Sequence, residues 1–258
     1  MPFFDGVSGP VYYRHWDAAS PRAAVVFLHG FGEHTGVYHR FGAALNQADI
    51  DLWALDEIGH GLTGGQRGEI ESIDALVSNG QRLTDLAARA GLPLVIAGHS
   101  LGAVAAMVTT LRHPDRYRAA VLTGAPLSMP QWFAELEGAG DAFSLDLDEL
   151  SGDPFYRDSL ENDPLAFTEA DIVDVLRRAL PPAWAEVAET IGDLRIPVLA
   201  LNGSEDAVAP AADVAVVAAR SAQIRTLVFE GMKHDILNET AHREVAEAIT
   251  AFVRSAAG

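Results

Sequence analysis

The apolar residues of this chain gather in short runs, and the polar residues within and between the runs indicate which of them are strands. Residues 11–16 alternate between apolar and polar positions, as a strand with one exposed face does. Residues 94–97 are apolar throughout, which is typical of a strand buried on both faces of a sheet. Further strands of the same sheet are expected at residues 23–28, 50–55, 119–123, 196–201 and 225–229.

Helical patterns alternate with these runs. The segments that fit helices connecting one strand to the next are residues 73–90, 103–112, 211–222 and 240–257. Strands that alternate with helices form a mostly parallel sheet that is covered by helices on both faces. In such a sheet the reactive residues collect beyond the carboxyl ends of the strands. We therefore expect an α/β fold with its functional site at that end of the sheet.

One long segment interrupts this alternation. Between residues 126 and 193 no strand of the core type is predicted, although large apolar side chains are frequent. A stretch of this length needs structure of its own, so we predict a helical cap at residues 127–192, inserted before the last two core strands. Residues 1–126 and 193–258 would form the core. The large side chains, most of them expected to pack within the cap and the rest to line an apolar pocket, are Trp132, Phe133, Phe143, Phe155, Tyr156, Leu160, Phe167 and Trp184.

The composition excludes several classes of protein. The chain of 258 residues contains no cysteine, so disulfides and thiolate chemistry are ruled out. Its net charge of -18 argues against nucleic acid and anionic membranes as partners, because both require a basic surface. No stretch has the pattern of a signal peptide or a membrane span. We therefore expect a cytoplasmic protein without stable membrane anchoring, although the apolar cap could contact lipid aggregates transiently; the oligomeric state stays open.

The motif G-x-S-x-G at residues 98–102 connects the buried strand 94–97 to an apolar helix. A tight strand-to-helix turn of this kind exposes its serine in a strained conformation, and the flanking glycines let the strand and the helix approach each other. The helix N-terminus behind Ser100 also favours developing negative charge. Ser100 is therefore predicted to be a nucleophile. The neighbouring His99 would point away from it, so we expect a packed or hydrogen-bonded histidine there.

A serine hydroxyl needs a base that takes its proton, and the base works best when a carboxylate fixes its tautomer. Asp206 follows the strand 196–201 and His234 follows the strand 225–229, so both are expected on the side where Ser100 emerges. The chain order serine, aspartate, histidine is that of a known hydrolase triad. The acidic residues that compete with Asp206 are Glu205, Asp235 and Asp56. We favour Asp206 for its position one strand–helix unit before His234 and expect Asp56 to be structural.

The oxyanion of a tetrahedral intermediate needs backbone N–H donors. Leu101, directly after the nucleophile, supplies one in turns of this kind, and the loop after the strand 23–28 supplies the other. In that loop two glycines flank Phe31, whose N–H is the predicted donor. The remaining histidines form no H-E-x-x-H pattern, so neither a metal nor a cofactor is predicted.

Several motifs occur together along the chain: HGFGEH at 29–34 with Tyr38, DEIGHG at 56–61, GQRG at 65–68, GHSLG at 98–102, NDPL at 162–165 and KHDILNE at 233–239. In this combination the sequence resembles the monoacylglycerol lipase and lysophospholipase-type serine hydrolases of the α/β-hydrolase superfamily. The resemblance implies an α/β-hydrolase fold and a triad of Ser100, Asp206 and His234. It also implies oxyanion donors at Phe31 and Leu101 and an apolar cap that admits a single acyl chain.

These observations predict a cofactor-independent carboxylic ester hydrolase that works through an acyl-enzyme on Ser100. Its expected substrates are monoacylglycerols or similar lipophilic esters. Phe31, Glu57 and the acidic segment 141–153 differ from the common pattern of the family, so the substrate stays open. Other activities of the same triad are alternatives, namely a lactonase, a thioesterase, a carbon–carbon hydrolase or a perhydrolase. A ligand-binding sensor on the hydrolase scaffold is a further alternative.

Overall fold

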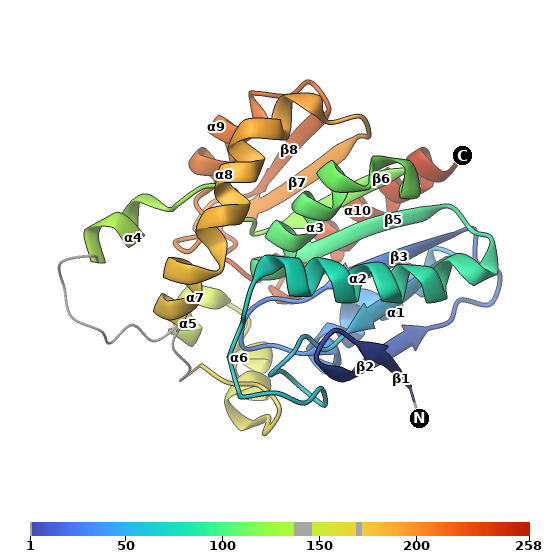
Figure 1. Ribbon diagram of the computed structural model, residues 1–258, viewed down its shortest axis with the longest axis horizontal. Helices are drawn as coiled ribbons and strands as arrows, with labels where there is room; N and C mark the ends of the chain where they lie inside the picture. Colours follow the sequence, from blue (N-terminus) through green and yellow to red (C-terminus); the bar gives the residue numbers. More distant parts are fainter. Residues whose placement is uncertain (1, 137–145, 169–171) are drawn as a thin grey trace.

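A single sheet forms the centre of the computed structural model, which describes residues 2–136, 146–168 and 172–258. Within these ranges the sheet has eight strands in the order β1-β2-β4-β3-β5-β6-β7-β8 (Figure 1). The strands are β1 (Phe3–Gly6), β2 (Gly9–Trp16), β3 (Ala23–Leu28), β4 (Ile50–Leu55), β5 (Leu94–His99), β6 (Ala119–Thr123), β7 (Val198–Gly203) and β8 (Ile224–Phe229). Strands β3 to β8 are parallel, and β1 and β2 are antiparallel to their neighbours. Phe143 lies outside the described residues, as do residues 141–145 of the acidic segment.

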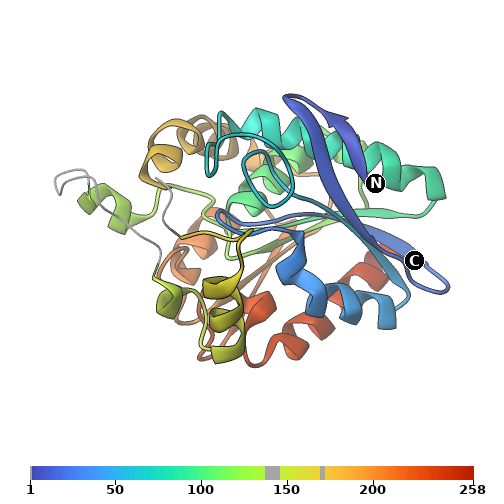
Figure 2. The same ribbon diagram turned by 90° about the horizontal axis from the view of Figure 1, so that it is seen from below.

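Helices cover both faces of this sheet, as Figures 1 and 2 show. The helices on one face are α2 (Ile73–Ala87), α3 (Leu101–Arg112), α8 (Leu180–Thr190) and α9 (Ala211–Ala218). The opposite face carries α1 (His39–Gln47) and α10 (His242–Ala257). Short 3-10 helices are η1 (Thr35–Tyr38), η2 (Ala88–Ala90), η3 (Pro114–Arg116), η4 (Ile191–Asp193) and η5 (Ile236–Asn238).

The central strands are apolar throughout because each of them contributes to two cores. In β3, Val26 and Leu28 pack toward α2 and α3, whereas Val25 and Phe27 pack toward α1 and α10. All four side chains are at most 1% exposed. Full burial of a side chain of this size contributes roughly 1.5–3 kcal/mol. The sheet is therefore a rigid platform whose carboxyl ends can hold reactive groups in place.

A helical cap lies between β6 and β7 in the chain and gathers at one end of the sheet (Figure 1). Its helices are α4 (Gln131–Leu136), α5 (Leu147–Leu150), α6 (Pro154–Asn162) and α7 (Ile172–Arg178), followed by α8, which packs against α3. The predicted α/β-hydrolase fold with a helical cap before the last two core strands is confirmed. The division of the chain at residues 126 and 193 stays a prediction.

The sequence pattern missed two elements for different reasons. Strand β1 is only four residues long and pairs with β2 at the edge of the sheet, where its side chains remain partly exposed. Helix α1 contains Gly42, a residue that disfavours helices. A Cβ atom at Gly42 would lie 2.8 Å from the Trp16 ring, so the glycine serves tertiary packing. Two helices are shorter in the structure than predicted from the sequence: the helix predicted at 211–222 ends at Ala218, and the one predicted at 240–257 begins at His242.

Candidate active site

Ser100 occupies the tight turn between β5 and α3 that the sequence predicts. Its backbone angles are φ 50° and ψ −117°, and the other non-glycine residue with positive φ in the described ranges is Asp49. The turn is very crowded. A Cβ atom at Gly98 would lie 2.3 Å from the Gly102 carbonyl oxygen, and one at Gly102 would lie 2.1 Å from the Leu28 carbonyl oxygen. Both glycines are therefore required for the close approach of β5, α3 and β3 that holds Ser100 in its strained conformation.

Asp206 and His234 meet across the loops that follow β7 and β8. His234 Nδ1 lies 2.9 Å from Asp206 Oδ1 and 3.0 Å from Oδ2. The same carboxylate also accepts the backbone N–H groups of Val208 at 3.0 Å and Ala209 at 2.8 Å. These donors fix the carboxylate, which in turn keeps the proton of His234 on Nδ1 and leaves Nε2 available as an acceptor.

Within the described residues, none of the three rival carboxylates is hydrogen bonded to His234. Asp56 accepts the backbone N–H groups of Thr35 and Leu62, which fits the structural role expected for it. Glu205 is exposed. Asp235, the residue after His234, contacts other side chains, described below. Ser100 and His234 line the same pocket, but no hydrogen bond joins the Ser100 hydroxyl to His234 in the described part of the chain. Bonds of this kind are commonly long without substrate.

The pair has the charges that a base and its supporting carboxylate need. Burial alone would raise the pKa of Asp206, but the charge of His234, its hydrogen bond and the Ala209 N–H hold that pKa below its ordinary value. Burial lowers the pKa of His234, but the charge of Asp206, its hydrogen bond and then the charges of Asp235 and Glu33 raise it to about 9. This raised pKa stabilises the imidazolium that forms when the neutral His234 accepts a proton, so we expect the base to become available as the pH rises.

The two predicted oxyanion donors lie beside Ser100. The N–H of Leu101 opens α3, and Phe31 lies in the loop after β3. Within the described residues neither of these N–H groups donates a hydrogen bond to the protein. Both are therefore free to bind a substrate oxygen. Phe31 is held in place by edge-to-face contacts with His60 and Phe167, at 5.5 and 5.6 Å between ring centroids.

Two pockets meet at Ser100. The first, here called the apolar pocket, is lined by Phe31, Ser100, Leu101, Pro126, Pro130, Trp132, Ile172, Val175, Leu176, Leu180 and Val208. The second, the polar pocket, is lined by Gly30, Phe31, Glu33, His99, Ser100, Leu150, Ile172, Val208, His234 and Asp235. Both pockets are mostly apolar, but the titratable groups Glu33, His99, His234 and Asp235 line only the second, so an ester held at Ser100 would have these groups on one side. This partition suits a substrate with one lipophilic and one polar end.

Sequence reasoning missed a buried polar cluster that lies next to His234. It consists of Glu33, Tyr38, His99, Tyr156 and Asp235, all less than a tenth exposed. His99 Nε2 lies 2.8 Å from Asp235 Oδ1, so His99 is hydrogen bonded, as the turn geometry predicted. Glu33 and Asp235 belong to the motifs HGFGEH and KHDILNE, but nothing in the sequence shows that a tyrosine from the cap joins them.

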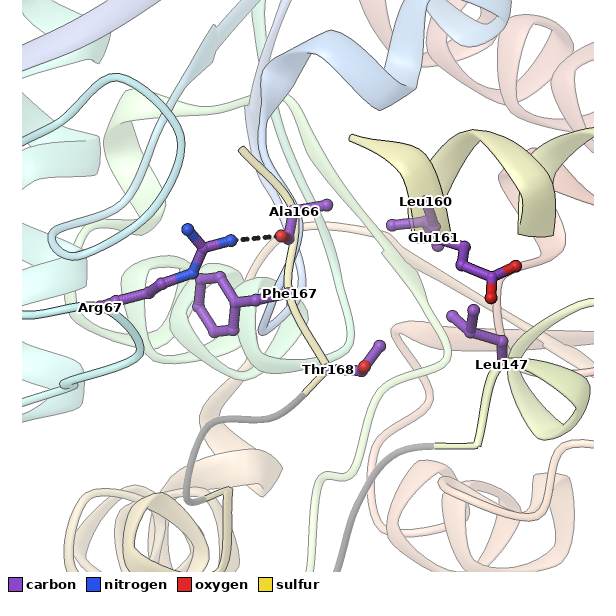
Figure 3. A pocket seen from close by; sticks show the side chains of 7 residues that line it. All are labelled: Arg67, Leu147, Leu160, Glu161, Ala166, Phe167 and Thr168. Atoms are coloured by element: carbon purple, nitrogen blue, oxygen red, sulfur yellow. Dashed lines mark hydrogen bonds between the residues drawn. The ribbon is translucent and has the colours of Figure 1, made fainter. Parts of the chain in front are cut away.

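A larger cavity of about 640 Å3 lies further out, between residues 166–168 and the helices α5 and α6 (Figure 3). The Arg67 guanidinium stacks over the Phe167 ring at 4.8 Å and donates to the Ala166 carbonyl oxygen. None of the predicted catalytic residues lines this cavity. It approaches the site through Phe167, whose ring also contacts Phe31.

Two groups of side chains in the described ranges are close enough to hold a metal ion. One is His99, His234 and Asp235, where both histidines are already hydrogen bonded to carboxylates. The other is His15, Asp17 and the buried Asp51, where Asp51 accepts the Ala18 N–H at 2.9 Å. The existing hydrogen bonds account for both groups, so the absence of a metal stays our prediction.

The fold and the strained serine beside a buried Asp–His pair define an α/β-hydrolase. Residues 19–241 match the family model described as serine aminopeptidase, S33, and the chain belongs to this family. It is 27% identical to a monoacylglycerol lipase of Mycolicibacterium smegmatis, over 98% of this chain and 96% of that protein. It is also 27% identical to the human monoglyceride lipase, over 92% of this chain and 82% of that one. The predicted enzyme class, a carboxylic ester hydrolase, is confirmed by these comparisons.

Solved structures agree on the fold. A monoacylglycerol lipase from Paleococcus ferrophilus superposes with a TM-score of 0.80 at 23% identity, covering 95% of this chain and 99% of that one. A carboxyl esterase from Bacillus coagulans has a TM-score of 0.82 at 22% identity, covering 99% and 98%. None of the helices in the described residues is long and apolar enough to cross a membrane.

Proposed function

We propose that this protein hydrolyses monoacylglycerols or similar lipophilic carboxylic esters through an acyl-enzyme on Ser100. The observation that carries the proposal is the meeting of two unlike pockets at Ser100, with the Asp206–His234 hydrogen bond beside it. The near-full-length similarity to proteins named monoacylglycerol lipase and monoglyceride lipase supports the substrate class. A cytoplasmic location and transient contact with lipid aggregates remain predictions.

In the first half of the reaction, His234 Nε2 takes the proton of the Ser100 hydroxyl while Ser100 Oγ attacks the carbonyl carbon of the ester. The carbonyl oxygen becomes an oxyanion that accepts the N–H groups of Phe31 and Leu101. Collapse of the tetrahedral intermediate breaks the bond to the alcohol oxygen, which receives the proton from His234. An ester between Ser100 and the acyl group remains. Asp206 stays ionised and stabilises the imidazolium.

In the second half, His234 takes a proton from water, and the resulting hydroxide attacks the acyl carbon. Ser100 leaves with the proton returned by His234, and a fatty acid is released. The acyl chain enters the apolar pocket, between α4 and α7 of the cap and Leu180; the volume of this pocket is about 30 Å3, so it must widen to hold a medium chain. The alcohol and the attacking water occupy the polar pocket, next to His234. The depressed pKa of Asp206 keeps this carboxylate charged through both halves.

Labelling with a fluorophosphonate probe and ester hydrolysis test the proposal together. The parent protein should bind the probe covalently at Ser100, and Ser100→Ala should lose both labelling and the hydrolysis of a short aryl ester. Rates on glycerol esters of increasing acyl length should rise from acetyl to medium chains. Equal activity of Ser100→Ala would overturn the mechanism, whereas a preference for acetyl would overturn only the lipophilic substrate. Thioesters and lactones in the same panel separate the alternative bonds.

A further inference from the structure

One cap residue, Tyr156 of α6, reaches into the polar cluster behind the site. Its hydroxyl oxygen lies 2.7 Å from Glu33 Oε1 and 2.9 Å from Asp235 Oδ2. Glu33 belongs to the loop after β3, and Asp235 belongs to the loop after β8. The single hydroxyl therefore bridges three parts of the molecule that are far apart in the sequence. The ring itself is buried, so water does not compete for these contacts.

The single hydrogen of the Tyr156 hydroxyl limits how the two carboxyl groups of the cluster can be protonated. A phenol hydroxyl carries one hydrogen, so it donates to one carboxyl group and accepts from the other only if that other group is protonated. Glu33 Oε2 already accepts the Tyr38 hydroxyl at 2.5 Å and the Gly30 N–H at 2.9 Å. The proton that the pair of Glu33 and Asp235 keeps therefore lies at the oxygens that face the Tyr156 hydroxyl, not at Glu33 Oε2. Burial and then the charge of Asp235 raise the pKa of Glu33, in agreement with a pair that keeps one proton.

Glu33 connects this proton-sharing pair to the oxyanion loop. Its carboxyl group binds the N–H of Gly30, the residue directly before Phe31. The packing is tight, because a Cβ atom at Gly30 would lie 2.6 Å from Glu33 Oε2 and 3.3 Å from Ser100 Cβ. A shift of the Glu33 carboxyl group would therefore move the turn that presents the Phe31 N–H.

Asp235 connects the pair to the base. It directly follows His234, its N–H donates to the Leu150 carbonyl oxygen of the cap at 2.8 Å, and its Oδ1 lies 2.8 Å from His99 Nε2. The His99 ring is 4.8 Å from the His234 ring. The charged and titratable groups that face His234 are thus Asp206, Asp235, Glu33 and His99, contributed by four different segments.

We propose that Tyr156 is a positioning residue, which holds the oxyanion loop and the histidine loop in register by bridging Glu33 and Asp235. The inference rests on the proposed function of Ser100 and His234. In this proposal the cap has two separate roles: Tyr156 supports the chemical step, and other cap residues contact the acyl chain. Neither Glu33 nor Tyr156 needs to touch the reacting atoms for this effect.

The direct test removes only the bridging oxygen. Tyr156→Phe should lower kcat about tenfold and change KM by less than about twofold, because a buried hydroxyl that binds both members of the carboxyl pair is lost while the pockets keep their shape. The matched control is Ser159→Ala on the same helix, an exposed hydroxyl that donates to the Phe155 carbonyl oxygen at 2.8 Å. This control should leave both constants unchanged. Tyr38→Phe, which removes a donor to Glu33 without separating it from Asp235, should lower kcat less.

A second arm uses Asp235→Asn. Loss of this charge should move the ascending limb of the pH profile of kcat/KM to lower pH, because the Asp235 carboxylate contributes to the raised pKa of His234. The effects of Tyr156→Phe and Asp235→Asn on kcat should be less than additive, since both break the same bridge. Glu33→Gln provides the same comparison from the other carboxyl group, should either variant fold poorly.

The outcomes separate the two proposals. If the parent protein lacks Ser100-dependent hydrolysis and probe labelling, the proposed function fails. If the parent protein is active but Tyr156→Phe matches Ser159→Ala in kcat, or the double variant is fully additive, the positioning role of Tyr156 is overturned alone. An equal fall of kcat in Tyr38→Phe and Tyr156→Phe would also overturn it, since the bridge to Asp235 would then contribute nothing.

Discussion

The two halves of the cap differ in their main contacts, although Trp132 of α4 also donates to the Val208 carbonyl oxygen at 3.0 Å. The polar cap segment, residues 147–162 with α5 and α6, is bound to the core by directional bonds: Leu150 to Asp235 at 2.8 Å, Gly152 to Glu239 at 2.7 Å, Asp153 to Arg40 at 2.6 Å, and Tyr156 to its two carboxyl groups. The apolar cap segment, formed by α4 and α7, instead presents Trp132, Ile172, Val175 and Leu176 to the pocket beside Ser100.

The difference indicates a division of labour. Hydrogen bonds act only at defined distances and angles, so they suit the segment that sets the position of the histidine loop. Apolar contacts tolerate changes of shape as long as volume is preserved, so they suit the segment that accommodates the acyl chain. Changes in the polar cap segment should therefore affect all substrates alike. Changes in the apolar cap segment should affect them according to chain length.

The largest effect is expected at Asp206, the carboxylate that is hydrogen bonded to His234. Asp206→Asn should lower kcat about 10⁴-fold, because the amide no longer fixes the tautomer of His234 or stabilises its charge. The loss should be equal for short and long acyl esters, since Asp206 touches neither pocket wall. Steady-state rates on an acyl-length series measure it. The control is Glu205→Gln, a change at the exposed neighbour. A loss of similar size in this control would mean that Asp206 is not the carboxylate that supports His234.

The next prediction concerns the attachment of the polar cap segment. Glu239 is buried and accepts the N–H groups of Gly152 at 2.7 Å, Lys233 at 3.2 Å and Thr240 at 2.9 Å. Glu239→Gln would turn one accepting oxygen into a donor, so the free energy of unfolding should fall by about 2–3 kcal/mol. Denaturant unfolding measures it, with the exposed Glu244→Gln as the control. An unchanged stability would mean that this segment is held by other contacts.

The features that the sequence predicts are local ones, and the features that it misses depend on contacts between distant segments. Ser100 and the glycines around it were predictable, because a strand, a turn and a helix next to one another determine their geometry. The bridge of Tyr156 was not, because 123 residues separate it from Glu33 and only the packing of the cap on the core brings them together. Helix α1 was missed because it contains Gly42, which disfavours helices but leaves room for the Trp16 ring.

A third prediction tests the apolar cap segment. Val175 on α7 is 2% exposed and lines the apolar pocket. Val175→Phe should fill part of that pocket and lower kcat/KM for medium-chain esters about tenfold, while acetyl esters keep their rate. The control is Val216→Phe on α9, a side chain that is 70% exposed. Equal losses on short and long esters would show that this segment also controls the chemical step, and the two halves of the cap would not differ.

The smallest effect is expected at Glu57, a buried carboxyl group that lacks the hydrogen-bond partners that Glu33 has. Glu33 has Tyr38, Tyr156 and the Gly30 N–H as partners, whereas both carboxyl oxygens of the fully buried Glu57 have no hydrogen-bond partner within the described residues. Burial, and then the charge of Asp56, raise the pKa of Glu57 well above its ordinary value. We therefore expect Glu57 to keep its proton to a higher pH in the folded chain than in the unfolded chain.

A folded-state pKa above the unfolded one contributes stability that is fully present below the unfolded pKa and is lost as the pH rises toward the folded pKa. Glu57→Met has a similar shape and no charge, so it should raise the free energy of unfolding by about 1 kcal/mol at neutral pH. Its advantage over the parent protein should be larger at about pH 8 than at about pH 5 by denaturant unfolding. Glu57→Gln, which does not titrate but keeps an unpaired amide, should remove the same pH dependence with a smaller gain. A constant difference between parent and Glu57→Met across this range would mean that Glu57 stays ionised in the folded protein and has a partner there.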